Sequence, residues 1–264
     1  MSELTLLYTA FGSQFGAKVL TALDACEEPY LVRAVDPRRF KTDLVPPHTV
    51  PQLRFRGEEN ILTDSADILA RLAEETGYPF YPTAEASELE QWVGNHLNAH
   101  VLYFTFWVEE GWRLSYQRKI AEAIPGPTPL LQWMMRRALP LRRLRGKMRS
   151  RARRQLAGGR IAEGRTPDPD EQVRMRASLL SAMQTLEDLF TQSNQQWLLT
   201  TDRPSAPDFA AYGVLERLVG NTGDACMGAA TPWLFEAANV PSLQAWHSRM
   251  QQHFPIKFKG KRGE

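Results

Sequence analysis

The stretch Thr49-Val50-Pro51-Gln52-Leu53 predicts a strand that begins at a proline. Proline has no N–H to give to a strand ladder, so it occurs at the start, the edge or a bulge of a strand, and the bond before it can be cis. We expect this arrangement to leave the Val50 backbone available to a ligand. The stretch therefore indicates an edge of the fold at which a small molecule can bind.

A second stretch, Leu62-Thr63-Asp64-Ser65-Ala66-Asp67-Ile68-Leu69, predicts a turn followed by the capped start of a helix. Side-chain oxygens and unpaired backbone amides gather at a helix N-terminus, and Asp64 and Ser65 fall at that position. These groups suit the amino and carboxylate ends of a peptide. Together the two stretches predict a small-molecule site.

The opening of the chain predicts a strand, a turn and a helix. The apolar run Leu4-Thr5-Leu6-Leu7-Tyr8 breaks at Phe11-Gly12-Ser13-Gln14-Phe15-Gly16, and a helix with regularly spaced apolar residues begins there. A second strand is expected around residues 30–35. The predicted order is therefore strand, turn with Ser13, helix, strand, proline-led strand and capped helix.

This order resembles the thioredoxin-like half of the glutathione transferase family. The matching residues are Tyr8 at the end of the first strand, Ser13 followed by Lys18-Val19, Val50-Pro51, and Asp64-Ser65. The resemblance implies a thioredoxin-like α/β N-terminal domain followed by an all-α C-terminal domain. It also implies glutathione as cosubstrate and a homodimer.

The domain organisation follows from a change of pattern near residue 80. The aromatic segment Tyr78-Pro79-Phe80-Tyr81-Pro82 cannot continue a helix, and helical periodicity begins after Thr83. We predict a glutathione-binding domain at residues 1–78, a linker at 79–86 and a helical domain at 87–264. A further helix is expected from about Asp170 to Phe190.

The segment Ser205-Ala206-Pro207-Asp208 predicts a helix start with a capping box, in which aspartate takes the place of the usual glutamate. The glutathione transferase family, which the chain resembles, has a similar box at the start of a buried helix of its helical domain. We therefore expect Asp208 to be structural.

The resemblance assigns the thiol chemistry to Ser13, with Tyr8 as the alternative. A free cysteine thiol has a pKa of about 8.5, and a hydrogen-bond donor or a helix N-terminus lowers it. Ser13 falls just before the first helix, but the same position also fits a simple helix cap without a catalytic role. Many relatives have proline where Gln14 stands, and Gly16 occupies the place of the second cysteine of a glutaredoxin-like pair. Thiol redox chemistry by the protein at this position is therefore excluded.

The resemblance also assigns the remaining contacts with glutathione. The Val50 backbone, before Pro51, would pair with the cysteinyl part, and Asp64 and Ser65 would hold the γ-glutamyl end. Relatives often carry glutamate or glutamine at the position of Asp64. Near the glycine carboxylate many relatives have lysine or another polar residue, and this chain offers Thr49, His48 or Lys41. The alternative is that these segments are a strand start and a capped helix that stabilise the fold without a ligand.

An aromatic stretch at residues 95–107 is a candidate wall for an apolar second substrate. Its candidates are Tyr103, Phe106 and Trp107, followed by Trp112. The same spacing is more typical of a helix core, so these residues are not included in the predicted site.

Composition excludes several classes of protein. The chain has 264 residues, of which 43% are hydrophobic, and it contains no apolar run long enough for a transmembrane segment and no signal-peptide pattern. We expect a cytoplasmic protein. Cys26 and Cys226 have no metal-ligand spacing, and the pair His96 and His100 would need further ligands from elsewhere. The sequence predicts no metal site.

Residues 136–165 form a basic segment with twelve Lys or Arg and one acidic residue, Glu163, which leaves 20 basic and 29 acidic residues for the rest of the chain. A basic amphipathic helix of this kind contacts nucleic acid, an anionic membrane surface or an acidic partner, or it is a solvated face.

The sequence thus predicts a glutathione-dependent transferase that activates the glutathione thiol for attack on a small electrophile. Reduction of peroxides and dehalogenation are related possibilities that the sequence leaves open. The alternative is a non-catalytic scaffold protein that uses the basic segment to contact an anionic partner.

Overall fold

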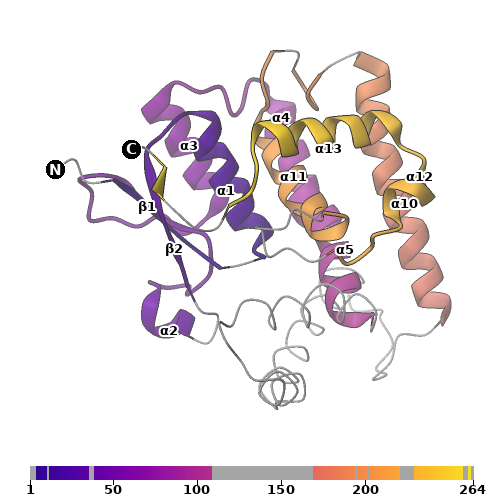
Figure 1. The fold of residues 1–264 in the computed structure, drawn as a ribbon, viewed down its shortest axis with the longest axis horizontal. Coiled ribbons are helices and arrows are strands. Elements are labelled where there is room, and N and C mark those ends of the chain that lie inside the picture. The colour runs from indigo at the N-terminus through magenta and orange to yellow at the C-terminus, as the bar shows by residue number, and fades with distance from the viewer. Residues whose placement is uncertain are drawn as a thin grey trace.

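The computed structural model describes residues 4–10, 12–35, 39–108, 169–193, 196–200, 202–220, 229–257 and 261–262. The predicted basic segment 136–165, together with Trp112 and Cys226, lies outside the described residues. Figure 1 shows a small sheet with two helices beside it and a larger group of helices next to them.

In the described part of the chain the sheet has four strands, in the order β3-β1-β2-β4. Strand β1 (Thr5–Thr9) runs parallel to β2 (Tyr30–Ala34) and antiparallel to β3 (Gln52–Arg54). The alternation of apolar side chains places Leu7, which is fully buried, on the face that packs into the core. The strands predicted at residues 4–8, 30–35 and 49–53 are present as β1, β2 and β3, with bounds that shift by one or more residues.

Two longer helices accompany the sheet. Helix α1 (Gln14–Ala25) packs against α3 (Ser65–Thr76) and against β1, and the short helix α2 (Phe40–Asp43) lies between β2 and β3 in the chain. Residues 16–23 of α1 are all buried. A helix that is buried on every side must have a second packing partner besides the sheet, and that partner is α11 of the helical half.

The helical half begins with one continuous helical segment from Ala84 to Trp107. It consists of α4 (Ala84–Trp92), the π-helical turn η2 (Val93–Leu97), α5 (Asn98–Leu102) and a second π-helical turn η3 (Tyr103–Trp107). Helix α4 starts inside the predicted 79–86 linker. Tyr103 and Phe106 are buried, so the core interpretation of the aromatic stretch is confirmed for these two residues.

The remaining helices among the described residues are α10 (Pro169–Ser193), α11 (Ala206–Leu218), α12 (Leu234–Ala238) and α13 (Pro241–His253). Helix α10 contains the helix predicted from about residue 170 to 190. None of the helices in the described part of the chain combines the length and the apolar character that a bilayer-spanning segment needs. The fold is thus a thioredoxin-like α/β domain followed by a helical domain.

The last strand, β4 (Lys261–Arg262), was not expected from the sequence. It returns to the first domain and pairs antiparallel with β2, where Leu31 is the register partner of Lys261. Figure 1 shows this C-terminal end beside the sheet. The C-terminal residues therefore extend the sheet at the edge that β2 would otherwise form.

A glycine allows α1 and α11 to approach closely. A Cβ atom at Gly213 of α11 would lie 2.4 Å from the backbone carbonyl oxygen of Gln14, at the start of α1. Since real side chains do not tolerate such a contact, glycine is required where α11 crosses the first turn of α1. The N-terminus of α1 is therefore held directly against the helical domain.

The predicted capping box at the start of α11 is confirmed, and Asp208 is its centre. The backbone N–H and the hydroxyl of Ser205 both donate to Oδ2 of Asp208, each at 2.9 Å. The other oxygen accepts from the backbone N–H of Leu198 at 2.8 Å and from Nε1 of Trp246 at 2.9 Å. Asp208 is fully buried. Its role is structural, because it joins α11, α13 and the segment before α11.

We expect Asp208→Ala to lower the free energy of unfolding by about 3 kcal/mol or more, since it leaves several buried donors without an acceptor. Thermal and urea denaturation would measure this loss. Asp202→Ala, at an exposed aspartate a few residues earlier, is the matched control and should change stability by less than ~0.5 kcal/mol. Equal effects of the two substitutions would contradict the structural role of Asp208.

Candidate functional site

Ser13 is the N-cap of α1. Its backbone is extended, with φ −78° and ψ 113°, and its Oγ accepts a hydrogen bond from the backbone N–H of Gly16 at 3.0 Å. The cap interpretation of Ser13 is therefore confirmed. The two roles are compatible, because a hydroxyl that accepts through its oxygen keeps its own proton to donate. Ser13 is half-buried and lies at the positive end of the helix dipole.

Tyr8 and Leu7 point to opposite faces of strand β1. Successive side chains of a strand point to opposite faces, and Leu7 packs into the core on the face that α1 covers. Tyr8 therefore points to the other face, where the guanidinium of Arg33 lies over its ring at 5.8 Å from the centroid. Ser13, as the N-cap, is directly next to the N-terminus of α1, and the choice between the two hydroxyls as thiol donor stays a prediction.

The Val50–Pro51 bond is cis, and β3 begins one residue later, at Gln52. Gln52 is the register partner of Tyr8, so Pro51 lies beside the end of β1, where the chain turns toward Ser13. The Gln52 side chain also fixes the loop before Val50, because it donates to the Val45 carbonyl at 2.7 Å and accepts from the Val45 N–H at 3.1 Å. Val50 itself is half-buried.

Asp64 is the N-cap of α3, as the sequence predicts. Its Oδ1 accepts from the backbone N–H of Ala66 at 2.7 Å, and its side chain is exposed. The segment before it pairs with β3, because Leu53 and Leu62 exchange two backbone hydrogen bonds of 2.9 Å. This antiparallel register brings the start of α3 toward Pro51. The N-termini of α1 and α3 and the start of β3 therefore lie at one edge of the domain.

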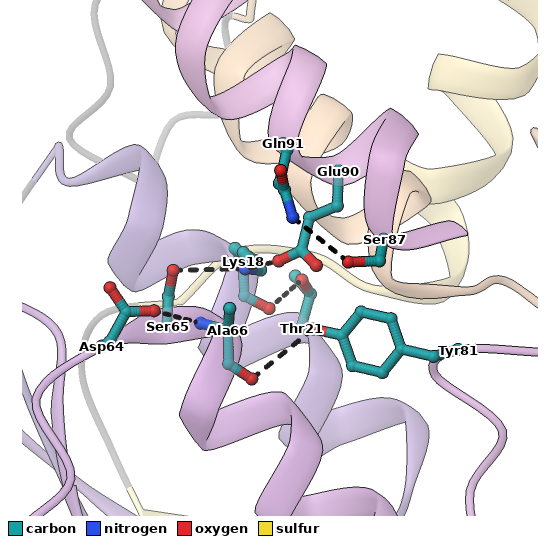
Figure 2. A network of polar contacts seen from close by, with 9 residues as sticks. All are labelled: Lys18, Thr21, Asp64, Ser65, Ala66, Tyr81, Ser87, Glu90 and Gln91. Carbon is teal, nitrogen blue, oxygen red and sulfur yellow. Dashed lines mark hydrogen bonds and ion pairs between the residues drawn. The ribbon is translucent and has the colours of Figure 1, made fainter. Parts of the chain in front are cut away.

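A buried lysine connects this edge with the helical domain (Figure 2). Lys18 of α1 donates from Nζ to Oγ of Ser65 at 3.2 Å and forms an ion pair with Glu90 of α4. Lys18 is 3% exposed and Glu90 is 6% exposed. Burial lowers the pKa of Lys18, and the carboxylates of Glu90 and then Asp64 oppose that effect. The pair is therefore enclosed between α1, α3 and α4.

In the sequence, Lys18 stands out only as part of the family resemblance and carries no predicted role, and Glu90 carries no local signal. The available signal is the position of this lysine among Ala17, Val19 and Leu20 in a helix with an apolar pattern. A lysine at such a position needs a counter-charge, because an unpaired buried ammonium is strongly unfavourable. The identity of the partner could not be read from the pattern.

Gln14, the residue that replaces the proline of many relatives, also contacts the helical domain. Its Nε2 donates to Oδ1 of Asn98 at 2.7 Å, and Asn98 is buried in α5. Glutamine in place of proline thus provides a hydrogen bond between the two domains next to Ser13. Like the contact of Lys18 with Glu90, it fixes the start of α1 relative to the second domain.

The three residues considered for the glycine carboxylate lie in the loop before β3. Thr49 and Lys41 are exposed. His48 is half-buried, and its Nδ1 contacts the carbonyl oxygen of Leu44 at 2.7 Å. The loop therefore offers polar groups near Val50, but a ligand contact by any of the three stays a prediction.

In the histidine pair His96 and His100, both ring nitrogens of His100 contact other groups of the protein. In His100, Nδ1 contacts the carbonyl oxygen of His96 at 3.1 Å and Nε2 contacts Oγ of Ser178 at 3.0 Å. Burial, followed by the proximity of His96, lowers the pKa of His100 to about 4. Within the described ranges, no group of three or more His, Cys, Asp or Glu residues is arranged to hold a metal ion.

Comparison with known proteins identifies the fold. No protein-family model matches the chain, and no curated protein matches it. Solved structures do match over nearly the whole length. The β-etherase LigF from Sphingobium sp. strain SYK-6 has 18% sequence identity and a TM-score of 0.57, with 94% of this chain and 94% of that chain covered.

Two further structures extend the similarity. Human glutathione transferase theta-2, in complex with glutathione, has 18% identity and a TM-score of 0.59, over 96% of this chain and 84% of that chain. A glutathione transferase from Phanerochaete chrysosporium with oxidized glutathione has 14% identity and a TM-score of 0.58, over 96% of this chain and 91% of that chain. The chain therefore has the glutathione transferase fold, and at these identities the similarity establishes the fold alone.

The pKa of His100 predicts a pH-dependent stability. His100 binds a proton less readily in the folded chain than in the unfolded chain, where a histidine has its ordinary pKa of about 6.5. Its contribution to the free energy of unfolding is therefore complete above about pH 6.5. Up to roughly 3 kcal/mol of that free energy is lost as the pH falls toward about 4. We expect His100→Asn to lose less unfolding free energy than the wild-type chain between about pH 7 and about pH 4 in urea titrations.

The matched control is Gln252→Asn, an exposed substitution near the end of α13 that neither adds nor removes a titrating group. It should leave the pH dependence of stability unchanged. If His100→Asn also retained the full wild-type pH dependence, the assignment of this titration to His100 would be wrong.

Proposed function

We propose that the chain binds glutathione at the edge formed by the N-termini of α1 and α3 and the start of β3, and that it activates the glutathione thiol for attack on a small electrophile. The observation that carries this proposal is the hydrogen bond from the Gly16 N–H to Oγ of Ser13. It uses the oxygen of the hydroxyl and leaves the proton to be donated to a thiolate. The fold, shared with transferases crystallised with glutathione, supports the same ligand.

Each part of glutathione has a suitable partner in this proposal. The Val50 backbone pairs with the cysteinyl part as an added strand would. Asp64 uses only Oδ1 for its cap, so its exposed carboxylate can also accept from the γ-glutamyl ammonium. The Ser65 hydroxyl and the amides at the start of α3 suit the carboxylate of the same group. The short side chain of Asp64 requires the ammonium to approach the helix closely.

The chemistry follows from the position of the thiol. A hydrogen bond from Ser13 and the positive end of the α1 dipole both favour the thiolate over the thiol. The thiolate attacks an electrophilic carbon, the new C–S bond forms, and the leaving group departs with its electron pair. Holding the two reactants together supplies the remaining rate enhancement. A serine forms no mixed disulfide, which favours conjugation or dehalogenation over thiol exchange. Peroxide reduction by bound glutathione would use the same thiolate.

A homodimer and a cytoplasmic location stay predictions from the sequence resemblance and composition. Sedimentation of the purified chain would test the first, and localisation of a tagged chain would test the second.

A non-catalytic role is the second candidate function, and the basic composition of residues 136–165 favours it. In that case charge reversal at Arg142, Arg143 and Arg145 should abolish capture of anionic vesicles, and capture by the wild-type chain should weaken steeply with salt. Salt-insensitive capture would contradict this candidate.

The role of Ser13 as donor can be separated from its role as cap. Glycine is nearly as good an N-cap as serine but has no hydroxyl. We therefore expect Ser13→Gly to raise the pKa of bound glutathione by on the order of one unit and to reduce turnover, while the melting temperature changes little. The ultraviolet absorbance of the bound thiolate, followed as a function of pH, would measure the pKa.

The control is Tyr8→Phe, which removes the alternative hydroxyl and should leave the thiol pKa unchanged. A thiol pKa that moves with Tyr8→Phe and stays constant with Ser13→Gly would reverse the assignment of the donor.

A further inference from the structure

The buried lysine of α1 cannot itself touch a ligand, yet it contacts a residue of the proposed site. Lys18 is 3% exposed, and its Nζ donates to Oγ of Ser65 at 3.2 Å. Ser65 is half-buried at the first position of α3, next to the cap residue Asp64. Lys18 therefore lies behind Ser65, on the protein side of the edge at which the ligand is proposed to bind.

The hydrogen bond from Lys18 fixes how the Ser65 hydroxyl can act. An ammonium has donors only, so Oγ of Ser65 must be the acceptor of this bond. One lone pair of the hydroxyl is then occupied by Lys18, and the proton of the hydroxyl points elsewhere. A hydroxyl oriented in this way is suited to donate to a carboxylate. Without Lys18, the same hydroxyl is free to rotate.

Glu90 keeps the lysine in this position and connects the arrangement with the second domain. Glu90 of α4 is 6% exposed. Its carboxylate forms the ion pair with Lys18 of α1 that Figure 2 shows. Two apolar residues of similar size would serve the interface as well, because the desolvation of a buried ion pair cancels much of its attraction. Stability alone therefore does not account for a charged pair directed at Ser65.

We propose that Lys18 is a positioning residue that orients the Ser65 hydroxyl toward the carboxylate of the bound γ-glutamyl group, with Glu90 of the helical domain holding Lys18 in place. This inference rests on the proposed binding of glutathione. It assigns to the interdomain ion pair a part in ligand binding, because the orientation of Ser65 then depends on the contact between α1 and α4.

The test is a double-mutant cycle on the full chain, read out as the Kd of reduced glutathione in calorimetry. Lys18→Met alone would leave Glu90 buried without a counter-charge, so the pair is replaced together as Lys18→Met with Glu90→Leu. Ser65→Ala is the other arm of the cycle, and the triple variant completes it. Melting curves establish that each variant is folded at the temperature of the titration.

We expect the paired substitution to weaken glutathione binding about fivefold, as the loss of one oriented hydrogen bond would. Ser65→Ala should weaken binding to a similar or larger degree. The triple variant should bind within about twofold of Ser65→Ala, because Lys18 has nothing to orient once the hydroxyl is absent. A purely structural ion pair would not produce this dependence on Ser65.

A matched control is Arg71→Met, which removes a cation on the same helix as Ser65. Arg71 pairs with Glu58 and Glu74 at the surface, away from the α3 N-terminus, and should leave the affinity unchanged. Unchanged affinity in the paired variant, or losses that multiply in the triple variant, would overturn the positioning role alone. A wild-type chain that does not bind glutathione would overturn the proposed function and this inference with it.

Discussion

The enclosure of α1 between the sheet and α11 is the constraint on which the other features depend. Residues 16–23 of this helix are all buried, and Gly213 lets α11 approach the backbone of its first turn. A helix enclosed in this way cannot shift without opening both domains. Its polar residues must therefore find partners within the protein, and the ion pair of Lys18 with Glu90 follows from that requirement.

The same constraint gives the candidate site its rigidity. Ser13 caps α1, Gln14 bonds to Asn98 of the helical domain, and Lys18 bonds to Ser65 at the start of α3. Two of these contacts, those of Gln14 and Lys18, thus join the site to the second domain and to α3. A binding edge built on such fixed elements holds its donors in place before a ligand arrives, which reduces the free-energy cost of binding.

Local signals in the sequence were sufficient for the order of elements and for the caps. Ser13, Asp64 and the box at Asp208 were predicted because a cap depends on residues close in sequence. The contacts of Lys18 with Glu90 and of Gln14 with Asn98 join residues 72 and 84 positions apart, so no local pattern indicates them. Strand β4 is two residues long and has no periodicity to recognise.

The binding of glutathione by the wild-type chain is the claim on which the proposed chemistry rests, and a calorimetric titration with reduced glutathione tests it most directly. We expect saturable heat with a Kd in the micromolar to low millimolar range, a free energy of about −4 to −8 kcal/mol. The melting temperature should rise with ligand concentration, since a ligand that binds only the folded chain stabilises it. No heat, together with an unchanged melting curve at millimolar glutathione, would contradict the proposed site.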